Sequence, residues 1–162
     1  MPLTQDFTAN VFFHNQKGKT FSSAAKNFGL DDFDHSSSYT YVDIDRDGDL
    51  DVVANTLYGP FKVYWNNVIK QNGISFKLRD QTANQFCIGC KITIHYGDGK
   101  KQFREIKAGG GFHSFDAPEA HFGLASNKQI NRLDIRWSNK EMIQINQPLI
   151  ANYEYQIIRK NK

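Results

Sequence analysis

Five aspartates fall at every second position within nine residues of this 162-residue chain. They are Asp43, Asp45, Asp47, Asp49 and Asp51. Carboxylates at loop positions 1, 3, 5 and 9, with a backbone carbonyl from position 7, can converge on one hard cation, and Gly48 at position 6 permits the sharp turn. Crowded carboxylates repel one another when no cation is bound. The spacing therefore predicts a metal loop in which all five aspartates take part, Asp49 through its carbonyl.

Calcium is the expected cation of this loop. Calcium accepts mixed carboxylate, carbonyl and water oxygens, whereas magnesium demands stricter octahedral geometry and keeps more waters. An EF-hand would need a glutamate at position 12 and flanking helices, but that position is Ala54 and both flanks alternate like strands. We expect a calcium loop that joins two strands of a hairpin, with an exposed acidic turn without metal as the alternative. Its role should be structural, since nothing beside the loop supplies a nucleophile or a general base.

The elements that must position this loop are predicted to be β-strands. Asn and Gln make up 24 residues, and Phe, Tyr, Ile and Val are abundant, which disfavours long helices. Short β patterns separated by turn residues recur along the whole chain, at 10–15, 38–44, 50–55, 61–66, 74–79, 90–96, 102–107, 133–137, 142–145 and 153–158. The strands are half-buried, which favours antiparallel pairing. The one helix candidate lies near residues 22–29, so we expect an all-β protein.

A break near Gln71-Asn72-Gly73 divides the chain into segments 1–72 and 73–162. The first segment carries 6 Lys/Arg against 9 Asp/Glu, a net charge of −3, and the second carries 14 against 8, a net charge of +6. The first segment has too few apolar positions for a core of its own, so it should pack on the second domain, on a partner or on absent chain. We therefore expect a fragment of a longer protein. We find neither a transmembrane run nor a signal peptide in the sequence.

Cys87 and Cys90 form the one cysteine pair of the chain. Their spacing resembles a redox motif, in which the first thiol lies at a helix N-terminus. Here the pair leads instead into an alternating strand pattern. A zinc site would need two further ligands, and none are evident. We expect two ordinary thiols, with a local disulfide as the alternative in an oxidising compartment.

The first segment resembles one repeat of the FG-GAP/VCBS type, over roughly residues 10–67. The resemblance rests on the stretches FFHNQKGKTFSSAAKNFGL, YVDIDRDGDLDVVAN and VYWNN. Such repeats are calcium-loop β units that build propeller blades, and the resemblance implies calcium at the same five aspartates. A single blade cannot close a propeller. We therefore expect missing repeats or an oligomer partner to cover this segment.

The second segment is similar to the ASPIC/UnbV domain, which in its families follows an FG-GAP/VCBS array. The similarity rests on residues spread from Asn84 to Ser138: Asn84, Ile88-Gly89, Gln102, Arg104-Glu105, Gly109 to Ser114, His121 to Leu124, and Leu133 to Ser138. We expect an antiparallel β-sandwich or a barrel-like domain here. Gly123 suggests a bulge or a tight corner.

The residues raise three further functions. A hydrolytic group of His113, Ser114, Asp116 and His121 lacks a nucleophile-elbow pattern, so we predict no catalytic residue and no enzyme. Nucleic-acid binding is not expected, because the cations are spread over several strands without a reader motif. Five aromatic residues suit either a carbohydrate surface or, as we expect, core packing: Tyr58, Phe61, Tyr64, Trp65 and Phe112.

The sequence thus favours a calcium-stabilised, non-catalytic binding or adhesion module of an exported protein, at an extracellular, periplasmic or cell-surface location. It would present loops to a protein or glycan partner. The alternative is an accessory or enzymatic domain of a biosynthetic, UnbV-type protein. A pocket that joins His113, His121 and Asp116 would favour that alternative.

Overall fold

The computed structural model describes residues 9–33, 35–67 and 71–160, and nearly all of their regular structure is β. The strands are β1 (Phe13–Gln16), β2 (Thr20–Ser23), β3 (Ser36–Val42), β4 (Asp51–Thr56), β5 (Lys62–Tyr64), β6 (Asn72–Arg79), β7 (Lys91–Tyr96), β8 (Lys100–Glu105), β9 (Ala120–Ala125), β10 (Gln129–Ile130), β11 (Arg132–Arg136), β12 (Met142–Ile145), β13 (Leu149–Ile150) and β14 (Glu154–Ile158). One short 3-10 turn, η1 (Lys26–Phe28), lies where the helix candidate was expected. The all-β prediction is confirmed. Across the described residues we find no helix with the length and apolarity needed to cross a bilayer.

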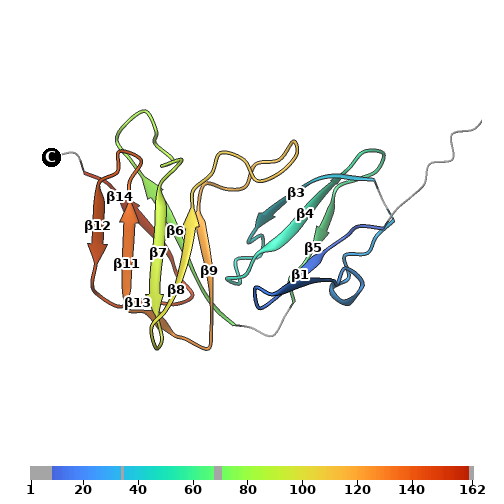
Figure 1. Ribbon diagram of the computed structural model, residues 1–162. Coiled ribbons are helices and arrows are strands. Elements are labelled where there is room, and N and C mark those ends of the chain that lie inside the picture. The colour runs from blue at the N-terminus through green and yellow to red at the C-terminus, as the bar shows by residue number, and fades with distance from the viewer. Residues whose placement is uncertain (1–8, 34, 68–70, 161–162) are drawn as a thin grey trace, which may run out of the picture.

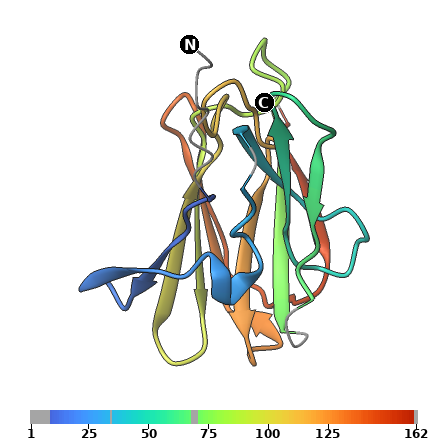
Figure 2. The ribbon, with the colours of Figure 1, turned by 90° about the vertical axis from the view of Figure 1, so that its right-hand side faces the viewer.

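The second half of the chain folds into an open sandwich of two sheets (Figures 1 and 2). One sheet has the order β12-β11-β7-β8 and the other has the order β14-β6-β9. Alternate residues of each strand enter the space between the sheets, because successive side chains of a strand point to opposite faces. In the described residues these sheets stay separate and no barrel closes, so the sandwich prediction holds and the barrel-like one does not.

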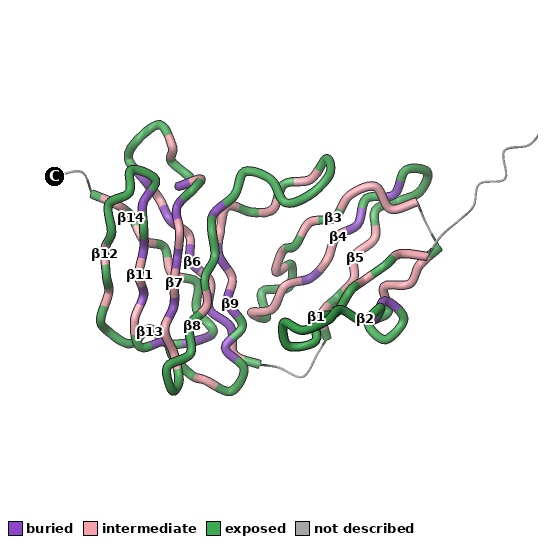
Figure 3. Tube along the Cα trace, viewed as in Figure 1, coloured by how far each residue is buried: buried purple, intermediate pink, exposed green. Residues whose placement is uncertain are grey.

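The hydrophobic core lies between these two sheets, within residues 74–151. Phe76 of β6 and Phe122 of β9 pack edge to face, with their ring centroids 6.0 Å apart. Ile92 and Ile94 of β7 are fully buried beneath the opposite sheet. In Figure 3 the buried parts of the trace gather on these strands. The alternation seen in the sequence is therefore the alternation that builds the core.

One strand pair departs from the expected antiparallel pairing. β14 lies parallel to β6, with Glu154 opposite Ser75 and Ile158 opposite Arg79. A parallel pair needs a crossover connection. Here the chain passes through β11 and β12 of the other sheet before β14 returns to the free edge of β6. This crossover connection makes the parallel pairing possible.

β9 was missed in the sequence, where Gly123 suggested a bulge or corner. Gly123 lies inside the strand, opposite Gly73 of β6. The register shifts beside this pair, because Asn72 faces Ala125 and leaves Leu124 without a partner position. The irregularity was thus placed correctly, but the strand that carries it was not recognised.

The first part of the chain forms two small sheets, the hairpin β1-β2 and the sheet β3-β4-β5. The buried hydrophobic residues among the described positions before Gln71 are the alanines Ala24, Ala25 and Ala54. Large apolar side chains of this part are exposed instead: Val11, Phe13, Phe21, Phe28, Phe33, Tyr39, Tyr41, Ile44, Leu57, Tyr58, Phe61 and Trp65. The expected shortage of core is confirmed, whereas the domain boundary at residues 72 and 73 stays a prediction.

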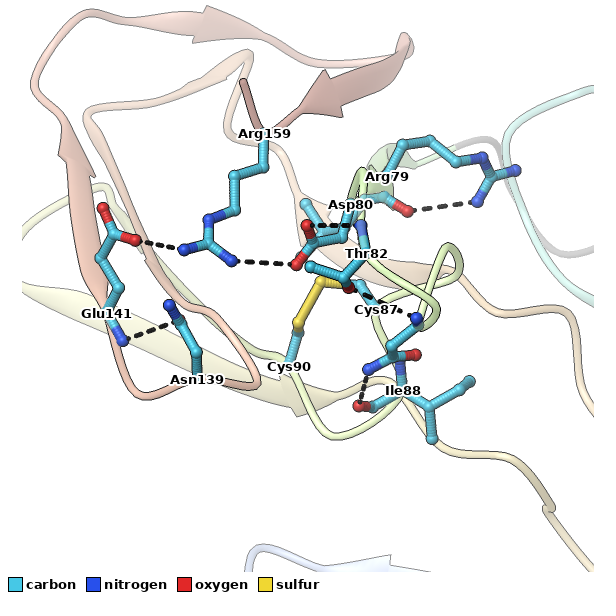
Figure 4. The surroundings of a disulfide bond; sticks show 11 residues. Arg79, Asp80, Thr82, Cys87, Ile88, Cys90, Asn139, Glu141 and Arg159 are labelled. Atoms are coloured by element: carbon cyan, nitrogen blue, oxygen red, sulfur yellow. Dashed lines mark hydrogen bonds and ion pairs between the residues drawn. A yellow bond between two sulfur atoms is a disulfide. The ribbon is translucent and has the colours of Figure 1, made fainter. Parts of the chain in front are cut away.

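Cys87 and Cys90 form a disulfide, so the expectation of two ordinary thiols was wrong (Figure 4). The turn between them has left-handed backbone at Cys87 (φ 58°) and Gly89 (φ 83°), which brings the two Cα atoms to 5.3 Å. The side chain of Asn84 fixes this turn, since its amide nitrogen donates to the Ile88 carbonyl at 2.8 Å and its oxygen accepts from the Ile88 amide at 2.9 Å. The disulfide was the alternative for an oxidising compartment, and the left-handed backbone at Cys87 that closes the short turn has no sequence signal.

The double substitution Cys87→Ala/Cys90→Ala should lower the free energy of unfolding by about 2 kcal/mol, because it releases the constraint on a short loop, with a sequence separation of 3, in the unfolded chain. Urea denaturation measures the loss, and wild-type protein treated with reductant is the matched comparison. Alkylation of both cysteines in denatured protein that was never reduced would contradict the disulfide.

Candidate metal site

The aspartate-rich loop connects β3 to β4, as the sequence predicted. Val42 pairs with Asp51 at the base of this antiparallel hairpin, so residues 43–50 form the connection. Gly48 has a φ of 98° and Arg46 a φ of 61°, and these two left-handed positions fold the loop back on itself. The predicted turning role of Gly48 is confirmed.

Three carboxylates of the loop meet at one point. Asp43, Asp45 and Asp51 each offer an oxygen atom, and these atoms lie within 4.8 Å of one another. Asp47 and Asp49 belong to the same loop but lie outside this tight group. The predicted role of Asp49, a ligand through its backbone carbonyl, stays a prediction.

Asp51 anchors the group from beneath. It is only 2% exposed, and both of its oxygens accept backbone hydrogen bonds. Oδ2 accepts from the Ile44 amide at 3.0 Å, and Oδ1 accepts from the Asn66 amide at 2.9 Å. Asn66, which follows β5, was not singled out in the sequence, because nothing in the sequence shows that β5 returns beside the loop.

Other aspartates of the loop accept hydrogen bonds from its own backbone. Asp43 Oδ2 accepts from the Gly48 amide at 3.1 Å, Asp45 Oδ1 from the Asp47 amide at 3.3 Å, and Asp47 Oδ1 from the Asp49 amide at 3.1 Å. These bonds aim the carboxylates and satisfy one oxygen of each. Asp43 Oδ1 and Asp49 Oδ1 are buried without a hydrogen-bond partner. A buried acceptor without a partner is costly, and a cation would satisfy it.

The electrostatics of the loop also favour a cation. Burial raises the pKa of Asp49, and the charges of Asp47, Asp51, Asp45 and Asp43 raise it further. A raised pKa means that each additional negative charge in the loop is disfavoured. The donor set consists of oxygens alone, which suits calcium and other hard cations. The residues present therefore fit the predicted metal.

The loop packs against the sandwich at Gly73 of β6. A Cβ atom at this position would lie 2.6 Å from the Gly48 carbonyl oxygen and 3.0 Å from Cε1 of His121. Only glycine leaves room for this approach. In the sequence Gly73 marked only a break in the chain, because close contact between distant backbones leaves no local pattern.

His121 of β9 lies at the same junction. Its Nδ1 is 3.0 Å from Ser75 Oγ on β6. Burial lowers the pKa of His121, while the negative charges of Asp43 and Glu119 oppose that shift. His121 is therefore half-buried, with a serine hydroxyl as the partner of its ring.

A second contact joins the two parts of the chain at Asp116. Its Oδ1 accepts from Thr40 Oγ1 at 3.0 Å and from the Tyr41 amide at 3.3 Å, both on β3. Figure 1 shows the segment between β8 and β9 reaching toward β3. Asp116 thereby covers part of the outer edge of β3.

The structure does not assemble the hydrolytic group that the sequence raised. Asp116 is bonded to β3 and His121 to Ser75, while the ring of His113 packs on that of Phe112 at 4.1 Å between centroids. A cleft of about 160 Å³ is lined by Asp116 and His121, but His113 does not line it.

The expectation that the five aromatic residues pack in the core was wrong for four of them. Tyr58, Phe61, Trp65 and Phe112 are exposed. Tyr64 is half-buried, and its hydroxyl donates to Asp32 Oδ2 at 2.7 Å. Burial and this bond raise the pKa of Tyr64 to about 12.

Known proteins resemble this chain in two ways. The family model described as ASPIC and UnbV matches residues 80–162, half of the chain. Cartilage acidic protein 1 of Mus musculus and of Homo sapiens are each 38% identical to it over 56 residues, which is 34% of this chain. That stretch is 9% of the mouse protein and 8% of the human one, so the chain matches less than a tenth of the length of these curated relatives.

The substitution Gly73→Ala should destabilise the protein by about 1–3 kcal/mol, because the new methyl group collides with the loop carbonyl. Gly123→Ala is the matched control, since Gly123 faces Gly73 in the same strand pair and has open space around its Cα. The control should change stability by less than about 0.5 kcal/mol. Equal denaturation midpoints for the two variants would contradict the close contact.

Proposed function

The chain belongs to the ASPIC and UnbV family, and from this membership we propose that it is a calcium-stabilised, non-catalytic binding or adhesion module of an exported protein. The observation that carries the proposal is the loop itself. Asp43, Asp45 and Asp51 converge there, and the buried oxygens Asp43 Oδ1 and Asp49 Oδ1 have no protein partner.

The mechanism is rigidification of the junction. Bound calcium offsets part of the negative charge of the aspartates and holds the loop in one conformation. The carbonyl of Gly48 in that loop lies close to Gly73, so a fixed loop also fixes the start of β6. The surfaces on both sides of the junction thereby keep a fixed relative position, in which they can contact a protein or glycan partner.

The first part of the chain is proposed to be one repeat of the FG-GAP/VCBS type. Its exposed apolar side chains and its alanine-only buried set suit a blade whose faces are covered by further repeats or by an oligomer partner. The small share of the relatives that this chain matches agrees with a larger protein.

Export is supported by two observations. Disulfides persist in oxidising compartments and are rare in the cytosol, and Cys87 and Cys90 form one. The matched relatives also carry a name that ties them to cartilage. We therefore propose an extracellular, periplasmic or cell-surface location.

The second candidate function is an accessory or enzymatic domain of a biosynthetic protein. The cleft that joins Asp116 and His121 supports it. The side chains of Asp116 and His121 argue against it, because both already have partners in the protein. Asp116 accepts a hydrogen bond from β3, and the ring of His121 pairs with the Ser75 hydroxyl.

Calcium should raise the melting temperature of the protein, because a ligand that binds only the folded state stabilises it by about 2.7 kcal/mol at a hundredfold excess over Kd. For a chain of this length that is about 5–10 °C. The measurement is thermal unfolding during calcium titration, with chelator as the reference.

Two variants sharpen the calcium experiment. Asp45→Asn should abolish most of the shift, whereas Asp98→Asn should leave it intact, since Asp98 is an exposed carboxylate in the distant β7-β8 turn. A melting temperature that is the same in calcium and in chelator would overturn the proposal.

A further inference from the structure

Asn72-Gly73, at the start of β6, is the one Asn-Gly dipeptide in the sequence of this chain. In such a dipeptide the backbone nitrogen of the glycine can attack the asparagine side chain, because glycine has no Cβ atom to shield that nitrogen. Asparagine is therefore a thermolabile residue. The fold requires this glycine, since a Cβ atom at Gly73 would lie 2.6 Å from the Gly48 carbonyl oxygen. The residue that makes Asn72 reactive thus cannot be exchanged for a larger one.

Asn152, in the turn between β13 and β14, binds both reacting groups of this dipeptide. Its Oδ1 accepts from the Gly73 amide at 3.0 Å, and its Nδ2 donates to Asn72 Oδ1 at 2.9 Å. Its backbone amide also donates to the Gly73 carbonyl at 2.6 Å. The nitrogen that would attack and the carboxamide that would be attacked are thus each held by the same side chain.

The turn that carries Asn152 is a fixed part of the sandwich. Ala151 is buried in the core, and its amide donates to the Lys128 carbonyl at 2.9 Å. Asn152 itself has a φ of 64°, a left-handed conformation that asparagine adopts more readily than most other residues. The residue type at position 152 therefore suits both the backbone of the turn and the contact with Asn72-Gly73.

We propose that Asn72 is a deamidation site and that the side chain of Asn152 controls the rate of its deamidation. In the reaction the Gly73 nitrogen gives its proton to hydroxide and forms a bond to Cγ of Asn72. The Cγ–Nδ2 bond breaks, and the leaving nitrogen takes a proton from water and departs as ammonia. Water then opens the resulting cyclic imide at either carbonyl, which leaves aspartate or isoaspartate at position 72. No oxidant or reductant takes part.

The hydrogen bonds of Asn152 oppose the first step in two ways. The Gly73 nitrogen must give up the proton that it shares with Asn152 Oδ1. The carboxamide of Asn72 must turn toward that nitrogen, which breaks its bond to Asn152 Nδ2. Both bonds are lost before the new N–C bond forms, so together they raise the barrier.

Deamidation would change the junction with the aspartate loop. Isoaspartate carries the main chain through its side chain and so adds one atom to the backbone immediately before Gly73. Either product also adds a negative charge one residue from the contact between Gly73 and the Gly48 carbonyl. Protection by Asn152 therefore preserves that contact, and it goes beyond the proposed function because it requires no bound calcium.

The test is peptide mapping of the full chain by mass spectrometry after incubation in mildly alkaline buffer, with conversion of Asn72 as the readout. Folded wild-type protein should react at least about tenfold more slowly than the same protein unfolded in urea. Asn152→Gly should speed the reaction of the folded protein about tenfold, because two side-chain hydrogen bonds are lost. Glycine keeps the left-handed backbone of the turn.

Asn146→Ala is the matched control and should react like wild type. Asn146 is an exposed asparagine that follows β12 of the other sheet, and its side chain donates to Gln144. Asn152→Asp is a second variant, which retains an acceptor for the Gly73 amide and loses the donor to Asn72. Its rate should lie between those of wild type and Asn152→Gly.

The urea midpoint of each variant shows whether the protein is folded during the incubation. If Asn152→Gly is unfolded there, the comparison between Asn152→Asp and wild type decides. Conversion of Asn72 at the wild-type rate in the folded Asn152 variants would overturn the proposal. Equal rates for folded and unfolded wild-type protein, or an equal acceleration by Asn146→Ala, would overturn it as well.

Discussion

The repulsion among closely spaced carboxylates in the loop between β3 and β4 is the interaction on which this account depends. Asp51 is buried at the base of the loop, and its two oxygens are held by the Ile44 and Asn66 amides. That anchoring fixes the base of the loop, while Asp45 and Asp47 stay exposed above it. Backbone amides satisfy some of the oxygens, but Asp43 Oδ1 and Asp49 Oδ1 remain without partners. A hard cation reduces the repulsion and gives these oxygens a partner, and the loop then becomes a fixed part of the fold.

The two parts of the chain are stabilised in different ways. The sandwich has a continuous core between its sheets, which includes Phe76, Phe122 and Ile92. The first part buries no hydrophobic side chain larger than alanine among its described residues. Among the described residues it contacts the sandwich where Gly48 meets Gly73 and where Asp116 accepts from β3. Because hydrophobic burial contributes little in the first part, the polar contacts and the metal loop should determine how it sits on the sandwich.

Local patterns predicted much of the fold and most of the candidate site. Alternation of apolar and polar residues located β6, β7 and β11, because a strand buried on one face must repeat with a period of two. The aspartate spacing and Gly48 located the loop, because those features depend on residues that are near one another in sequence.

The features that the sequence did not reveal depend on distant parts of the chain. The approach of Gly73 to the loop, the parallel pairing of β14 with β6 and the support of Asp51 by Asn66 all arise only when the chain is folded. Exposure of Phe61 and Trp65 was also missed, because an aromatic residue in a β pattern has the same local signature whether it faces a core or an uncovered surface.

The most direct measurement is a crystal structure of the protein grown with calcium, with the ion identified by its anomalous scattering. The account predicts one ion in the loop, with oxygens of Asp43, Asp45 and Asp51 at about 2.3–2.6 Å. A loop that holds no ion in excess calcium, with these three carboxylates turned apart into solvent, would contradict it.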